Sequence, residues 1–145
     1  MQVLRRRTAG WVALVLTSGV LSSGTVAAAQ TCDSTRVHTL VAQLPQAPST
    51  FRAGRVLQVP LGVGRAAGVA PDVTLQVGLF GDGWNIYANA VTDLDGRAVA
   101  RFAVPAGVRG PVTLDVDAYR VLASLPCLDI EEYDRVVRPW GRVVA

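Results

Sequence analysis

The sequence contains no lysine, one histidine and two cysteines, and these shortages limit its chemistry. Two cysteines and one histidine do not complete a structural zinc site, and a redox C-x-x-C motif is missing. No serine lies in a nucleophile-elbow sequence, and there is neither a Gly-rich phosphate loop nor an H-E-x-x-H motif. We therefore expect a protein that is not an enzyme and holds no cofactor or metal ion. A carboxylate-only glycosidase or a small hydrolase remains an alternative, and the hydrolase requires a cleft containing His38 or the pair Asp115 and Asp117.

Acidic residues are absent from the first 32 positions, whereas three of the 14 arginines stand at positions 5–7. The arginines precede an uncharged apolar segment that ends in small residues, with Ala27 and Ala29 in an A-x-A cleavage pattern. This order is typical of a secretory signal, and we expect residues 1–29 to be removed. An uncleaved membrane anchor is the alternative, because residues 8–31 carry no charge and are long enough to span a bilayer.

The remaining 116 residues carry 11 arginines and 11 acidic residues, so their formal charge is zero rather than +3. A neutral domain gives no electrostatic reason to expect nucleic acid or a membrane as a partner. The length suits one domain, and we predict a single domain over residues 30–145 that is secreted, periplasmic or held at the cell surface.

The two cysteines stand near the two ends of this domain. In an oxidising compartment such a pair predicts a disulfide between Cys32 and Cys127 that closes a loop of 95 residues. Chain-entropy arguments give such a link about 4–5 kcal/mol of stabilisation. Two unpaired thiols are the alternative.

Short segments rich in Val, Leu and Thr, separated by Gly, Pro and Asp, predict strands and turns. The expected strands are 55–63, 72–79, 84–91, 97–104 and 112–119, with a strand or short helix at 36–44 and a last strand near Val136. Period-two alternation places the following residues on core faces: Val73, Leu75, Val77, Leu79, Ala98, Ala100, Phe102, Val104, Val112, Leu114, Val116 and Ala118. Expected turns are 81–83, 93–96 and 105–111. No segment keeps a helical period, so the sequence predicts an all-β fold, an antiparallel β-sandwich of about seven strands.

Four phrases in this order resemble bacterial immunoglobulin-like domains: Phe51 to Arg55, Thr92 to Ala98 with the pattern T-D-x-D-G-x-A, Pro105-Ala106-Gly107, and Gly110 to Leu114. Invasin-like, macroglobulin-like and carboxypeptidase-regulatory-like domains share such phrases. The resemblance covers about residues 50–121 and leaves residues 122–145 unexplained. It implies an immunoglobulin-like sandwich that serves as an extracellular structural, adhesive or accessory module without chemistry of its own.

The segment from Trp84 to Asn89 is the main candidate for recognition. Strand alternation places Asn85, Tyr87 and Asn89 on the face opposite Trp84. A tyrosine ring between two amides is suited to stacking on a sugar or anchoring a protein interface. An ordinary half-exposed sheet face is the alternative.

Three acidic groups are weaker candidates. The pattern Asp93-x-Asp95-Gly96 resembles the start of a calcium loop, but Arg97 and Val104 stand where an EF-hand needs ligands, so an Asp-capped turn is favoured. Asp115 and Asp117, two apart on an outward face, suit a cation or an acid–base pair, although exposed strand charges also keep sheet edges soluble. The acidic run over residues 129–134 is expected to be a solvated loop with local ion pairs. Contact with a basic partner or weak binding of calcium is the alternative.

Together these features predict a secreted, non-enzymatic surface or envelope module that binds a protein or carbohydrate of the cell envelope. The alternative is a secreted or periplasmic inhibitor or accessory protein that acts on one enzyme through a loop at 81–84 or 105–110.

Overall fold

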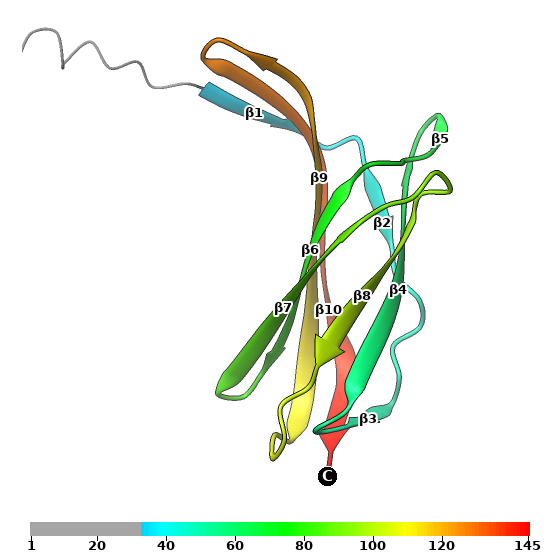
Figure 1. The fold of residues 1–145 in the computed structure, drawn as a ribbon, viewed down its shortest axis with the longest axis vertical. Coiled ribbons are helices and arrows are strands. Elements are labelled where there is room, and N and C mark those ends of the chain that lie inside the picture. The colour runs from blue at the N-terminus through cyan, green and yellow to red at the C-terminus, as the bar shows by residue number, and fades with distance from the viewer. Residues whose placement is uncertain (1–32) are drawn as a thin grey trace, which may run out of the picture. The chain divides into compact units, whose positions relative to one another are not determined.

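The computed structural model describes residues 33–145, whose strands form two β-sheets and which contain no helix (Figure 1). The strands are β1 (Asp33–Val37), β2 (Val41–Gln43), β3 (Thr50–Arg52), β4 (Val56–Arg65), β5 (Gly68–Val69), β6 (Thr74–Gly81), β7 (Trp84–Val91), β8 (Arg97–Ala103), β9 (Gly110–Leu125) and β10 (Leu128–Val144). The six-stranded sheet has the order β1-β10-β9-β6-β7, and β3 also pairs with β10. The four-stranded sheet has the order β2-β4-β5, and β8 also pairs with β4. No helix able to cross a membrane occurs in this part of the chain.

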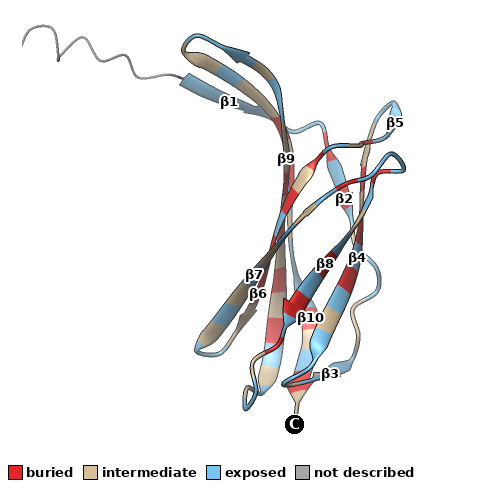
Figure 2. Ribbon diagram, viewed as in Figure 1, coloured by how far each residue is buried: buried red, intermediate tan, exposed pale blue. Residues whose placement is uncertain are grey.

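The core lies between the two sheets and consists mainly of alternating aliphatic side chains. Figure 2 shows the buried positions, in red, along the strands of both sheets. Eleven of the twelve residues that alternation places on core faces are buried, and the twelfth, Ala98, is half-buried against the core. This confirms the predicted facing of β6, β8 and β9. The four-stranded sheet contributes Val59, Leu61 and Val63 of β4 to this core, and Leu40, which directly precedes β2, also belongs to it. Burial of this apolar surface is the main force that holds the two sheets together.

The predicted turns also occur. Gly83, with a φ of +75°, closes the two-residue hairpin between β6 and β7. Gly96, with a φ of +71°, ends the turn before β8, and Gly107 lies in the β8–β9 loop with a φ of +79°. Glycine populates positive φ without a steric penalty, so these positions suit the conformation that each turn requires.

The fold departs from the predicted antiparallel sandwich in strand number and direction. The described residues form ten strands, and the six-stranded sheet is mixed because β1 and β3 both run parallel to β10. β1 pairs with the first part of β10 and β3 with its last residues. Between these two strands the chain passes through β2 in the other sheet. Short parallel strands therefore cover both ends of the outer edge of β10, a long-range arrangement that no local sequence pattern encodes.

The segment predicted at 36–44 is divided rather than continuous. β1 ends at Val37 in the six-stranded sheet, and β2 begins at Val41 in the four-stranded sheet. Leu40, between them, is buried in the core. The crossing therefore takes place over three residues and joins the two sheets.

The C-terminal segment forms the longest strand of the domain. Where the sequence indicates a short strand near Val136, β10 extends from Leu128 to Val144 and carries the buried side chain of Trp140. Its pairing with β9 shifts register between Pro139 and Arg142. One extra residue of β10 lies in this bulge, where Gly141 has a φ of +72°.

The turn between β9 and β10 contains Cys127, which adopts a positive φ of 63°. Its carbonyl accepts a hydrogen bond of 3.1 Å from the backbone N–H of Asp33. Cys32 and the proposed signal, residues 1–29, lie outside the described residues. The contact of Asp33 with Cys127 is compatible with the predicted disulfide, which stays a prediction.

Gly141 supplies a first test of the fold. Its φ is +72°, and a Cβ at this position would collide with the backbone carbonyl of Pro48. Gly83 has a similar φ of +75°, but open space surrounds it. We expect Gly83→Ala to cost about 1 kcal/mol of unfolding free energy and Gly141→Ala at least twice as much, because only the second adds a collision to the strain. Denaturant unfolding measures both, and equal losses would contradict the close approach of Pro48.

The disulfide supplies a second test. The protein purified from an oxidising compartment should have a mass two hydrogens below that of the reduced chain. Cys127→Ser should lower the unfolding free energy by about 4 kcal/mol, because it releases the loop-closure constraint on the unfolded chain. Reduction of the wild-type protein should produce the same loss, whereas a mass that shows two free thiols would rule the bond out.

Candidate binding face

A shallow polar depression of 340 Å³ lies on the outer face of the six-stranded sheet. Its lining comes from four adjacent strands and consists of Gln76, Gly78, Tyr87, Asp115, Asp117 and Arg135. Strand register brings these residues together: Gly78 of β6 pairs with Tyr87 of β7 on one side and with Asp115 of β9 on the other. Asp117 in turn pairs with Arg135 of β10.

Tyr87 forms the aromatic wall of this depression. Its side chain is 59% exposed, and its ring meets that of Phe80 edge-on at a centroid distance of 5.5 Å. Gly78 lies beneath the two rings, and a Cβ there would strike both of them. The missing side chain at Gly78 therefore allows the Tyr87 ring to settle against the sheet next to the carboxylates.

The predicted recognition face of β7 is present as an exposed surface. Asn85, Tyr87 and Asn89 are exposed, whereas Trp84 and Ile86 pack against the core. Asn89 is the register partner of Gln76, so its amide extends the polar surface along the sheet.

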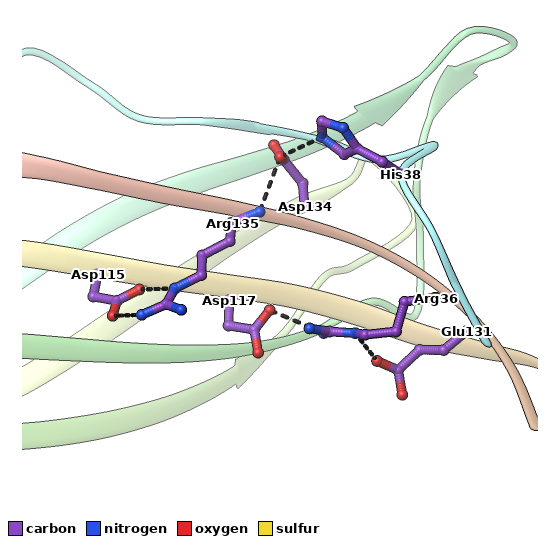
Figure 3. A network of polar contacts seen from close by, with 7 residues as sticks. All are labelled: Arg36, His38, Asp115, Asp117, Glu131, Asp134 and Arg135. Atoms are coloured by element: carbon purple, nitrogen blue, oxygen red, sulfur yellow. Dashed lines mark hydrogen bonds and ion pairs between the residues drawn. The ribbon is translucent and has the colours of Figure 1, made fainter. Parts of the chain in front are cut away.

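Arg135 and Asp115 form a two-pronged ion pair on this face (Figure 3). Nε of Arg135 donates to Oδ1 of Asp115 at 3.1 Å, and Nη2 donates to Oδ2 at 2.7 Å. These hydrogen bonds, and the negative charge of Asp115, raise the pKa of Arg135. The forked geometry fixes the plane of the carboxylate as well as its charge.

Arg36 of β1 holds the second carboxylate (Figure 3). Its Nη2 donates to Asp117 at 3.1 Å, and its Nε donates to Glu131 at 2.8 Å. The guanidinium also stacks over the ring of Tyr133, 4.4 Å from its centre. Desolvation lowers the pKa of Arg36, but the bonds and charges of Asp117 and Glu131 outweigh it, so the pKa is raised overall.

The resulting surface can accept hydrogen bonds from a polar ligand. Asp115 and Asp117 each already receive hydrogen bonds from an arginine, yet each carboxylate has further lone pairs to offer. Within residues 33–145, no group of three or more His, Cys, Asp or Glu side chains is placed to hold a metal ion. His38 does not lie in this depression; its Nε2 is hydrogen-bonded to Asp134 at 2.7 Å.

The acidic run at 129–134 is not the solvated loop that its composition suggests. It lies within β10, where alternation turns Glu132 and Asp134 toward the other sheet and buries them. Glu132 forms an ion pair with Arg65 of β4 and accepts a hydrogen bond of 3.2 Å from Thr39. Charge is tolerated inside because each carboxylate has its own donors.

Asp134 anchors the crossing between the sheets. Its Oδ2 accepts the backbone N–H of Ala42 in β2 at 2.7 Å. Its Oδ1 is bonded to His38 at 2.7 Å and to the backbone N–H of Arg135 at 2.9 Å (Figure 3). One buried carboxylate thus joins β10, the crossing segment and the second sheet.

Asp93 has the turn-capping role that the sequence favours over calcium binding. Its Oδ1 accepts backbone N–H bonds from Asp95 at 2.9 Å and from Arg97 at 3.0 Å. The side chain therefore closes the turn that leads into β8.

A second depression of 680 Å³ is larger but offers fewer polar groups. It lies over β4, β8 and the segment after β2, and its lining includes Leu44, Pro45, Pro60, Val91 and Val99. The polar side chains in its lining are those of Gln43, Asp93 and Arg97. The carboxylate of Asp93 already accepts backbone hydrogen bonds within the 93–96 turn. The outer face of the six-stranded sheet therefore combines an aromatic ring and fixed polar groups better than this larger hollow does.

The sequence indicated Tyr87, Asp115 and Asp117 as separate candidates and did not predict that they line one depression. It missed Gln76, Gly78, Arg36 and Arg135 as contributors to the face. The alternation of β6 was a usable signal for Gln76, since it places that residue opposite Leu75. No local signal exists for the arginines, because they reach the carboxylates only through pairing of β10 with β9 and β1.

No protein family and no curated protein matches the sequence. Among solved structures, one similar chain is that of AvmM, described as catalysing macrocyclization in alchivemycin A biosynthesis. It is 9% identical, the match covers 73% of this chain and 90% of that chain, and the TM-score is 0.40. A similarity this weak carries no argument about family or activity.

Asp134 and Asp115 should differ in how much they stabilise the fold, because Asp134 binds a buried backbone N–H and Asp115 forms a surface ion pair. Asp134→Ala leaves the buried N–H of Ala42 without an acceptor, and we expect a loss of about 1–3 kcal/mol in unfolding free energy. Asp115→Ala removes only an exposed ion pair, so we expect a clearly smaller loss. Thermal and denaturant unfolding of both variants provide the comparison, and equal losses would contradict the anchoring role of Asp134.

Proposed function

We propose that this protein is a non-enzymatic binding module whose outer sheet face recognises a hydroxylated carbohydrate of the cell envelope. The observation that carries the proposal is the placement of the exposed Tyr87 ring beside fixed hydrogen-bonding groups on one shallow face. The secretory pattern of residues 1–29 supports an extracellular, periplasmic or surface location. The resemblance to immunoglobulin-like modules supports an accessory rather than catalytic role.

Carbohydrate chemistry matches these groups. The carbon–hydrogen face of a sugar ring packs on an aromatic ring, and its hydroxyls both donate and accept hydrogen bonds. Asp115 and Asp117 offer acceptors, while Gln76 offers both an acceptor and donors. A bulky or deeply apolar ligand would find no enclosed cavity on this face.

The two arginines order the carboxylates of this face without any ligand. Arg135 holds Asp115 through two hydrogen bonds, and Arg36 holds Asp117. Side chains that are already ordered lose less conformational entropy on binding. The network thus favours binding by a rigid surface over adjustment of mobile loops.

Binding of purified envelope polysaccharide, measured by calorimetry or affinity electrophoresis, tests the proposal. Tyr87→Ala should weaken binding at least tenfold because it removes the stacking surface, and Tyr87→Phe should retain most of the affinity. Tyr119→Ala is the matched control, since Tyr119 lies on the same face of β9 outside the depression. An affinity unchanged by Tyr87→Ala would remove this face from the site.

The alternative function is inhibition or assistance of one enzyme through a protruding loop. Figure 1 shows the β6–β7 hairpin and the β8–β9 loop at the same end of the domain, where both can contact one enzyme. A stoichiometric complex with one enzyme, abolished by changes in residues 105–110 and unaffected by Tyr87→Ala, would favour this alternative over carbohydrate binding.

A further inference from the structure

The last strand of the six-stranded sheet, β7, has an unusual edge. It is the terminal member of the order β1-β10-β9-β6-β7 and pairs only with β6 among the described residues. Its eight residues, Trp84–Val91, contain no charge, no proline and no glycine. Charges, prolines and bulges are the usual features that keep an edge strand from pairing with another chain, and β7 has none of them.

Other edges of the two sheets are short or charged. β1 carries Asp33 and Arg36, and β8 carries Arg97 and Arg101. β2, β3 and β5 have only two or three residues each. β7 is therefore the long, uncharged edge of the described domain.

The hairpin register shows which backbone groups this edge presents. Gly81 pairs with Trp84 across a two-residue turn, and in such a turn the closing pair is mutually hydrogen-bonded. Alternation along the ladder then directs the backbone groups of Trp84, Ile86 and Ala88 toward β6. Those of Asn85, Tyr87 and Asn89 point away from the sheet, where they are available to another strand.

We propose that the β7 edge pairs antiparallel with the β7 edge of a second copy of this chain. The structure supports a second copy rather than an unrelated strand because the edge is self-complementary. A two-fold axis would place the segment 85–89 opposite itself, and an uncharged strand meets no like-charge repulsion in that arrangement. The side chain of Tyr87, which is 59% exposed, would lie opposite its symmetry mate and stay on the open outer face.

This pairing joins two six-stranded sheets into one continuous sheet. The two outer faces would then lie side by side and point the same way, with a Tyr87 ring from each copy near the junction. Dimerisation would use the edge of β7, whereas carbohydrate binding would use the outer face, so the protein can show one property without the other.

The molecular mass of the protein in solution tests this proposal. The protein is purified from cells that express the full sequence. Analytical ultracentrifugation over a range of concentrations should show a dimer at high concentration. Hydrogen exchange at the backbone amides of Asn85, Tyr87 and Asn89 should slow as the dimer forms. A single-chain mass up to millimolar concentration, with exchange that does not change, overturns the proposal.

Two variants locate the interface. Asn89→Pro removes an N–H that points away from β6, so it should abolish dimerisation and leave the ladder with β6 intact; Asn89→Ala keeps this N–H and should remain dimeric. If the proline variant does not fold, the double substitution Asn85→Lys and Asn89→Lys replaces it, and it should weaken the dimer most at low salt. A dimer that survives both Asn89→Pro and the lysine pair, with the circular dichroism of the wild type, contradicts pairing through β7.

Discussion

The buried carboxylate of Asp134 is the interaction on which the arrangement of the two sheets depends. It accepts a backbone N–H from Ala42 in the four-stranded sheet while its own strand, β10, belongs to the six-stranded sheet. The ion pair between Glu132 and Arg65 adds a second polar link two residues away. Loss of either partner would leave a buried charge or N–H unpaired, so these links disfavour other ways of crossing between the sheets.

The same strand that carries these buried acids also builds the opposite face. Because side chains alternate along β10, Arg135 points to the outer face directly after the inward Asp134. There it orients Asp115, and Arg36 orients Asp117. The polar links inside and the proposed binding face outside are therefore two sides of one register, and a slip of one residue in β10 would exchange them.

Much of the fold was predictable because its signals are local. Alternation identified β6, β7, β8 and β9 and their buried sides, and glycine at positive φ marked the turns. The length of β10 was not predictable, since acidic residues and Pro139 interrupt its apolar pattern. Its burial of Glu132 depends on Arg65, which lies 67 positions away in the sequence. Parallel pairing of β1 and β3 is likewise a property of distant segments.

The sequence by itself determined the all-β class, the core faces of the central strands and the exposure of Tyr87, because each follows from period-two alternation and turn chemistry. Only the tertiary structure decided that Tyr87, Asp115, Asp117 and Arg135 share one depression. The physical reason is that a side chain's face is set within its own strand, whereas its neighbours across the sheet are set by pairing and register. Those pairings depend on long-range contacts of β10 that the local pattern does not contain.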